Sequence, residues 1–266
     1  MARSIISVIN QKGGVGKTTT TINLATALVK KGKKILIIDL DPQGNATTGL
    51  GKSNNDEEKS VYNILIGKIS AENAIQESSV KDLDLIGSNV NLSGLEVETA
   101  NDANRAFLLK EILKKENNSL FNNYENIFID CPPSLSLLTV MSLVSADELL
   151  IPLQTEFFAL EGITQLVKTI DRIKANLNPK LSIRGILLTM FDKRNKLSSQ
   201  VDNEARKHFK DKVYKTVIPR NVRLSEAPSH GVPCLIYDKG CPGSKSYISL
   251  AEEFINQNNQ FMGSAA

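Results

Sequence analysis

Short, almost continuous apolar runs alternate along this chain with longer amphipathic stretches. The apolar runs predict strands at Ser4–Asn10, Ile35–Asp39, Leu83–Ile86, Ile127–Asp130, Glu148–Pro152, Ile183–Met190 and Val213–Ile218. The amphipathic stretches predict helices at Thr18–Lys31, Ala106–Lys115, Leu160–Leu177, Gln200–Lys210 and Ser244–Ile255. Strands that lack polar alternation are buried on both faces. We therefore predict an α/β fold, a mainly parallel twisted sheet with helices on both faces.

Neither an internal repeat nor a low-complexity tract divides the 266 residues. We predict one domain over residues 1–257 and a poorly ordered tail at 258–266. Ligands of parallel sheets bind at the carboxyl ends of the strands, so we expect the functional residues there.

A glycine-rich segment directly follows the first predicted strand and precedes a predicted helix. It consists of Lys12, Gly13, Gly14, Val15, Gly16, Lys17, Thr18 and Thr19. Glycines let backbone N–H groups approach phosphate oxygens, and the helix N-terminus adds further N–H groups. In a phosphate loop of the pattern G-x-x-x-x-G-K-[ST], Lys17 reaches the β- and γ-phosphates and Thr18 ligates Mg²⁺. The segment departs from this pattern, because Gln11 replaces the first glycine and Lys12 is an additional cation.

Carboxylates end two of the predicted strands. Asp130 follows the run Ile127–Ile129 and fits the strand-end Asp that holds Mg²⁺, usually through water, in phosphate-loop NTPases. Asp39 ends another strand, and Asp41 lies just beyond it, where a loop could bring it near a γ-phosphate and an attacking water. The alternative for each is a strand-end Asp that caps a turn.

Charge is distributed unevenly along the chain. The formal net charge is +3, but residues 193–223 hold ten Lys or Arg against three acids, a charge of +7 that leaves −4 for the rest. This asymmetry fits a polyanion-binding surface, although a solvated helix face would look the same. The three cysteines form no C-x-x-C pair, which disfavours a zinc or iron–sulfur site. No apolar run approaches the ~20 residues that span a bilayer, and we expect a cytoplasmic protein.

Four segments together resemble the ParA family. They are Lys12–Thr19, Asp39–Asn45, Asp130–Ser134 and Pro219–Arg223, in that order along the chain. The pattern is most similar to Soj-type members that lack an extra N-terminal domain. The resemblance extends from about Ile5 to about Leu250.

The resemblance implies an ATP-dependent switch. Members of this family bind Mg-ATP, form a homodimer with two nucleotides at its interface, and hydrolyse ATP slowly. Lys17 would serve its own nucleotide and Lys12 that of the partner subunit, in the manner of an arginine finger. Asp41 would activate the water, Thr18 and Asp130 would hold Mg²⁺, and Pro219 and Asn221 would line the adenine site.

The resemblance also implies partners. Soj-type dimers bind double-stranded DNA without sequence preference, and Arg194 and Arg223 match the arginines implicated in that binding. Both arginines lie inside the +7 stretch. A ParB-type centromere-binding protein would stimulate the ATPase, and release from nucleoid DNA would then segregate a chromosomal or plasmid origin.

Two other classes share the unusual loop. A MinD-like cell-division ATPase binds the membrane through a basic amphipathic C-terminal helix, but Tyr247–Met262 contains two Glu and neither Lys nor Arg. We therefore expect no stable membrane binding. A nitrogenase-iron-protein-like reductase needs two suitably spaced cysteines for a shared cluster, and Cys131 has no partner at a matching place. Metabolic phosphate-loop enzymes remain an alternative, and they would not need the charge at 193–223.

Overall fold

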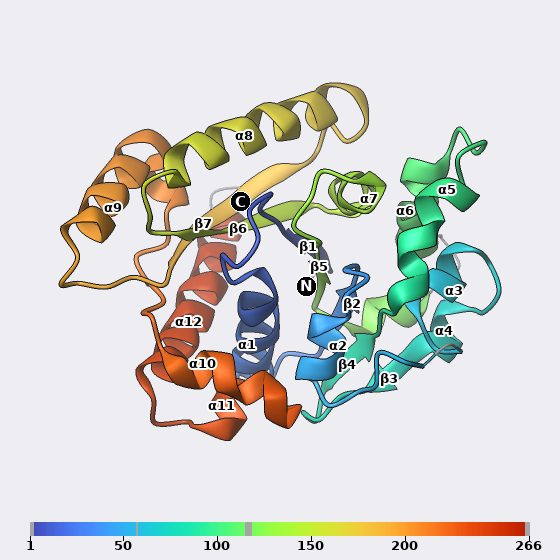
Figure 1. Cartoon of the computed structure of the whole chain (residues 1–266), viewed down its shortest axis with the longest axis horizontal. Helices are drawn as coiled ribbons and strands as arrows, with labels where there is room; N and C mark the ends of the chain where they lie inside the picture. The colour runs from blue at the N-terminus through green and yellow to red at the C-terminus, as the bar shows by residue number, and fades with distance from the viewer. Residues whose placement is uncertain (1–2, 57, 115–118, 264–266) are drawn as a thin grey trace.

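A twisted seven-stranded sheet forms the centre of the computed structural model, which describes residues 3–56, 58–114 and 119–263 (Figure 1). The strand order is β3-β4-β2-β5-β1-β6-β7, and all pairings are parallel except that of β3 with β4. The strands are β1 Ser4–Val8, β2 Ile35–Asp39, β3 Ile75–Glu77, β4 Leu83–Ile86, β5 Asn126–Asp130, β6 Glu148–Gln154 and β7 Ser182–Thr189. The predicted α/β class is confirmed.

Helices cover both faces of this sheet. They are α1 Lys17–Val29, α2 Asn45–Gly49, α3 Val61–Leu65, α4 Ala71–Ala74, α5 Leu95–Glu98, α6 Leu108–Lys114, α7 Leu137–Ser145, α8 Ala159–Asn176, α9 Lys196–Phe209, α10 Val222–Glu226, α11 Cys234–Tyr237 and α12 Pro242–Gly263. In Figure 1, α1, α10, α11 and α12 lie below the sheet, and α7 and α8 lie above it.

Alternate residues of the central strands belong to two separate hydrophobic cores. Ile5 and Ile127 belong to the core under α6, α7 and α8. Ile6 and Phe128 belong to the core under α1 and α12. Successive side chains of a strand point to opposite faces, so the apolar runs of the sequence are buried on both faces of the sheet.

The strand register brings three chain positions together at one edge of the sheet. Val8 at the end of β1 pairs with Asp130 at the end of β5, and Asp130 pairs with Asp39 at the end of β2. The loop after β1 therefore starts beside two carboxylates. This is the edge at which the sequence places the functional residues.

The short elements β3, α2, α3, α4, α5, α10 and α11 were not predicted. The structure also differs from the predicted elements in three further places. Residues 213–218 form no strand, because only isolated bridges join Val213 to Ile186 and Pro219 to Phe191. The apolar segment 137–145 forms helix α7, which the pattern did not predict. Helix α12 continues to Gly263, so the expected tail at 258–266 lies partly in this helix and partly, at 264–266, outside the described residues. Within the described part of the chain, no helix is long and apolar enough to cross a bilayer.

Candidate functional site

The glycine loop turns sharply into α1 through two left-handed residues. Gly14 has φ +74° and Gly16 has φ +88°, and Gly16 caps the N-terminus of α1. Gly13, which could also adopt a positive φ, does not do so. The hydroxyl of Thr189 at the end of β7 donates to the Val15 carbonyl at 2.8 Å. These contacts fix a loop whose N–H groups gather at a helix N-terminus, the arrangement that binds phosphate.

Lys17 points into the loop rather than into solvent. Its side chain is buried, and its Nζ donates to the Lys12 carbonyl at 3.0 Å. Burial lowers the pKa of Lys17, and the negative charge of Asp130 opposes that shift. A buried ammonium held against a backbone carbonyl is in place to exchange that carbonyl for phosphate oxygens.

Asp130 is the centre of a buried hydroxyl–carboxylate cluster. Thr18 Oγ1 donates to Asp130 Oδ2 at 2.7 Å, and Thr21 Oγ1 donates to Asp130 Oδ1 at 2.9 Å. Burial raises the pKa of Asp130 to about 7, with a further contribution from the nearby charge of Asp39. Hydroxyl and carboxylate oxygens are the ligands that Mg²⁺ prefers, so Thr18 and Asp130 fit this cation.

Asp39 and Asp41 have different surroundings despite their proximity. Asp39 is fully buried and accepts hydrogen bonds from Thr47 N at 2.8 Å, Thr47 Oγ1 at 2.7 Å and Asp41 N at 3.2 Å. Burial raises the pKa of Asp39 to about 6. The carboxylate of Asp41 accepts one hydrogen bond within the described residues, from Gln43 N at 3.0 Å, and Asp41 lines the cavity beside the loop. Asp39 thus anchors α2, whereas Asp41 presents a carboxylate to the cavity.

Two adjoining cavities of about 370 Å³ each open beside the loop, with Gly16, Thr19 and Met190 in both walls. The first contains Lys17, Thr18 and Asp41 in its lining. The second is lined by Pro219, Asn221 and neighbouring residues, and the buried Oδ1 of Asn221 has no hydrogen-bond partner within the described residues. An unpaired buried amide oxygen is costly unless a ligand donates to it. The cavities fit a nucleotide with phosphates at the loop and a base at Asn221.

Lys12 lies outside this pocket. Its side chain is about half exposed and forms an ion pair with Glu156, in the loop between β6 and α8. Its backbone N–H donates to Asn10 Oδ1 at 3.0 Å, which fixes the start of the loop. The two lysines of the loop thus point to different places.

Two arginines of the basic stretch, Arg194 and Arg223, are exposed and paired with acids. Arg194 contacts both carboxylate oxygens of Asp192, at 3.1 and 2.9 Å, and these hydrogen bonds lower the pKa of Asp192 to about 2. Arg223 contacts Glu226 at 2.8 Å. The chain segments that precede Arg194 and Arg223 lie side by side, because Phe191 N donates to the Ile218 carbonyl at 3.0 Å.

Sequence reasoning missed three residues of the site: Thr21, Thr189 and Glu156. Thr21 follows Thr18 at i+3, so both lie on one face of α1. This spacing could have revealed the second hydroxyl that donates to Asp130. Thr189 contacts the glycine loop from β7, and Glu156 contacts it from the segment after β6. No local sequence pattern predicts such contacts.

A left-handed glycine loop, a buried lysine and a Thr–Asp pair at the carboxyl edge of a parallel sheet define a P-loop NTPase. A family model described as "AAA domain" matches residues 3–183. The solved structure of cobyrinic acid a,c-diamide synthase from Mycobacterium smegmatis, with bound ATP analogue and magnesium, has a TM-score of 0.82 and 31% identity; the match covers 94% of this chain and 93% of that one.

Two curated relatives show to which family of P-loop NTPases the chain belongs. The chromosome partitioning protein ParA of Caulobacter vibrioides is 48% identical over 262 residues, which cover 98% of this chain and 97% of the relative. The sporulation initiation inhibitor protein Soj of Bacillus subtilis is 49% identical over 249 residues, covering 94% and 97%. The chain belongs to the ParA/Soj family of chromosome-partitioning ATPases.

Proposed function

We propose that this protein is an ATP-dependent switch that dimerises around two nucleotides, binds DNA without sequence preference and segregates a chromosomal or plasmid origin. The observation that carries the proposal is that the side chains of the two loop lysines, Lys12 and Lys17, point to different places. Lys17 is buried within its own loop, whereas Lys12 is half exposed and held by Glu156 on the surface. A second cation that lies outside its own pocket is suited to the nucleotide of another subunit.

The surface around Lys12 supports a face-to-face dimer. Phe157 and Phe158 directly follow Glu156 and are 75% and 65% exposed. Their rings form an edge-to-face pair with centroids 5.0 Å apart. Exposed aromatic side chains of this kind are enriched at protein interfaces. When the subunits meet, Lys12 exchanges Glu156 for a phosphate oxygen of the partner's nucleotide.

Within each subunit, the residues have distinct tasks. The loop from Gly13 to Thr19 binds the phosphates, and Thr18 and Asp130 would hold Mg²⁺, with Asp130 acting through water. The bound Mg²⁺ would supply positive charge to the phosphate oxygens. Asp41, whose carboxylate accepts one hydrogen bond from the described residues, orients the attacking water, and Pro219 and Asn221 contact the adenine.

DNA binding follows from the exposed basic side chains near Arg194 and Arg223. Arg194, Lys193 and Arg220 line one cavity of about 570 Å³ beside the adenine-side cavity. Dimerisation doubles this surface, which would make DNA affinity depend on ATP. Contacts to phosphates carry no sequence information and weaken with salt. A nucleoid-associated cytoplasmic location would follow from such binding.

Variants of two residues test the switch. Asp41→Ala should give an ATP-bound dimer that still retards non-specific DNA on a gel. Lys12→Ala should bind nucleotide but remain monomeric in analytical ultracentrifugation. A monomeric Asp41→Ala protein at saturating ATP would contradict the proposed role of Asp41, and loss of nucleotide binding in Lys12→Ala would assign Lys12 to its own nucleotide.

Arg223→Glu tests the DNA surface. It should abolish the gel shift and leave ATP-dependent dimerisation intact. Lys81→Glu is the matched control, because it makes the same charge change at an exposed residue between β3 and β4, at the other edge of the sheet. Equal losses in both variants would mean that net charge, rather than this surface, controls binding.

A ParB-type partner should accelerate hydrolysis. Phosphate release by the wild-type protein is measured with DNA alone and with DNA plus the ParB-type protein. An unchanged rate would remove the partner from the proposal and leave the ATP switch standing.

The MinD-like alternative has less support. The apolar side chains of Tyr247, Leu250 and Phe254 on α12 are fully buried in the core against α1 and the sheet. Glu253 accepts the backbone N–H groups of Lys215 and Thr216 at 2.7 and 2.9 Å. A helix held in this way has no free apolar face up to Gln257. Co-sedimentation with anionic lipid vesicles would test membrane binding directly.

A further inference from the structure

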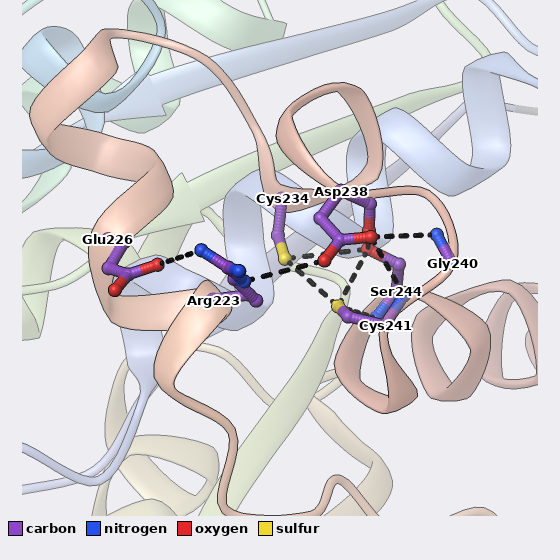
Figure 2. Close-up of polar contacts among 7 residues, drawn as sticks. All are labelled: Arg223, Glu226, Cys234, Asp238, Gly240, Cys241 and Ser244. Atoms are coloured by element: carbon purple, nitrogen blue, oxygen red, sulfur yellow. Dashed lines mark hydrogen bonds and ion pairs between the residues drawn. The ribbon is translucent and has the colours of Figure 1, made fainter.

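Two of the three cysteines face each other where α11 meets α12 (Figure 2). Cys234 is the first residue of α11, and Cys241 directly precedes α12. Their Sγ atoms lie 3.5 Å apart, although seven positions separate them in the sequence. Both are free thiols with buried side chains. The pair is therefore a contact made by the fold and not by a C-x-x-C motif.

A tight turn holds both sulfur atoms in place. Asp238 Oδ1 accepts the backbone N–H groups of Gly240 at 3.0 Å and of Cys241 at 3.1 Å. Ser244 Oγ donates to the Asp238 carbonyl at 2.8 Å and lies 3.4 Å from each sulfur. Ser244 N donates to Cys241 Sγ at 3.3 Å. A disulfide bond measures about 2.05 Å, so bond formation requires the sulfurs to approach by only about 1.5 Å.

We propose that Cys234 and Cys241 are a redox-active pair that forms a reversible intrachain disulfide when the protein meets hydrogen peroxide. In the first step, the thiolate of one cysteine attacks a peroxide oxygen, the O–O bond breaks, and a sulfenic acid and hydroxide form. In the second step, the sulfur of the other cysteine attacks the sulfenic sulfur. The S–O bond breaks, and the thiol proton leaves with the hydroxyl group as water. The two sulfurs lose two electrons together, and the peroxide gains them.

The pair lies beside a cavity, although Cys234 is fully buried and Cys241 is only 6% exposed. Cys234 lines the cavity of about 370 Å³ beside the glycine loop, together with Val232 and Pro233. Burial raises the pKa of Cys234 to about 11, so its thiolate is scarce near neutral pH. The reaction should therefore accelerate as the pH rises above neutrality. In a reducing compartment, such a bond is transient and a small thiol reverses it.

The turn that carries the pair also contacts the candidate DNA-binding surface. Asp238 Oδ2 lies 3.5 Å from Arg223 Nε. A dashed line in Figure 2 marks this ion pair. The disulfide would join the start of α11 to the start of α12 on either side of this contact. Its formation does not depend on whether Arg223 binds DNA, so the two proposals can fail separately.

The experiment treats the purified full-length chain with hydrogen peroxide, alkylates free thiols under denaturing conditions, and maps peptides without reduction. The wild-type protein should lose the mass of two hydrogen atoms and yield one linked peptide pair containing Cys234 and Cys241. Dithiothreitol should restore the starting mass. The initial rate should be severalfold higher at pH 8.5 than at pH 7.

Cys131 supplies the matched control. It is also buried, but its sulfur contacts the hydroxyls of Ser7 and Ser142 at 3.1 and 3.0 Å. Cys131→Ser should form the disulfide at the wild-type yield, whereas Cys234→Ser and Cys241→Ser should form none. The proposal is overturned if Cys234 and Cys241 of the peroxide-treated wild-type chain are both still free and become alkylated. It is also overturned if either links to Cys131, or if only intermolecular links appear.

Discussion

Alanine at Gly14 would test how the loop conformation is maintained. Gly14 has φ +74°, and apart from its chain neighbours a Cβ atom added there would meet no atom of the described residues within 4 Å. The substitution therefore introduces backbone strain without a steric clash. Gly13 is the matched control one residue away, because its φ is not positive and its added Cβ would make only an ordinary contact, 3.8 Å from Pro133 Cβ.

The structure sets the size of the effect. A left-handed conformation costs an L-residue roughly 1–2 kcal/mol. Replacing glycine by alanine also restricts the unfolded chain, which stabilises the native state by about 0.4–1 kcal/mol in both variants. This contribution cancels in the comparison. The free energy of unfolding of Gly14→Ala should thus be about 1–2 kcal/mol lower than that of Gly13→Ala.

The assay is urea-induced unfolding followed by circular dichroism, without nucleotide and with a chelator present, since a ligand would add its own stabilisation. With a denaturant slope of roughly 2–3 kcal/mol/M, the two midpoints should differ by about 0.3–1 M. Equal midpoints, or a lower midpoint for Gly13→Ala, would refute the reasoning.

Four further predictions follow from other contacts. Thr189→Val should lower the free energy of unfolding by about 1–3 kcal/mol, because the buried Val15 carbonyl loses its donor; an unchanged urea midpoint would contradict this. Glu156→Gln should change stability by less than about 0.5 kcal/mol, since the ion pair is exposed, but should lower the ATP concentration needed for dimerisation in ultracentrifugation. Asn221→Ala should weaken ATP binding about fivefold or more in calorimetry while leaving inorganic triphosphate binding unchanged. Burial raises the pKa values of Asp39 and Asp130, so the native state retains protons that the unfolded chain has lost; without nucleotide, the free energy of unfolding should fall as the pH rises from about 4 to about 7.

Much of this arrangement could be predicted from the sequence because its signals are local. The long parallel strands are built around almost continuous apolar runs, and the glycine loop and Asp130 lie at the ends of such runs. Residues 213–218 misled the prediction because β-branched and aromatic residues predominate in them, although a single isolated bridge, Val213 with Ile186, joins them to β7. Their backbone groups are partly bound by side chains such as Glu253, and composition does not reveal this.

The rest of the site depends on contacts between distant parts of the chain. The hydrogen bond from Thr189 to Val15 spans 174 positions, and the ion pair of Lys12 with Glu156 spans 144. The sulfur pair at Cys234 and Cys241 depends on how the Asp238 turn folds back. A single sequence carries no pattern for such pairings, because each depends on the tertiary path between the elements.

The shared register of Val8, Asp130 and Asp39 has a consequence for the lifetime of the protein. The candidate phosphate site is assembled across the central strands of the sheet, so it exists only while the centre of the fold is intact. A ligand held there at one hundred times its dissociation constant stabilises the native state by about 2.7 kcal/mol, which reduces the unfolded population about a hundredfold. The cellular nucleotide pool would thereby act as a chaperone-like protectant, and its depletion would expose the chain to proteolysis.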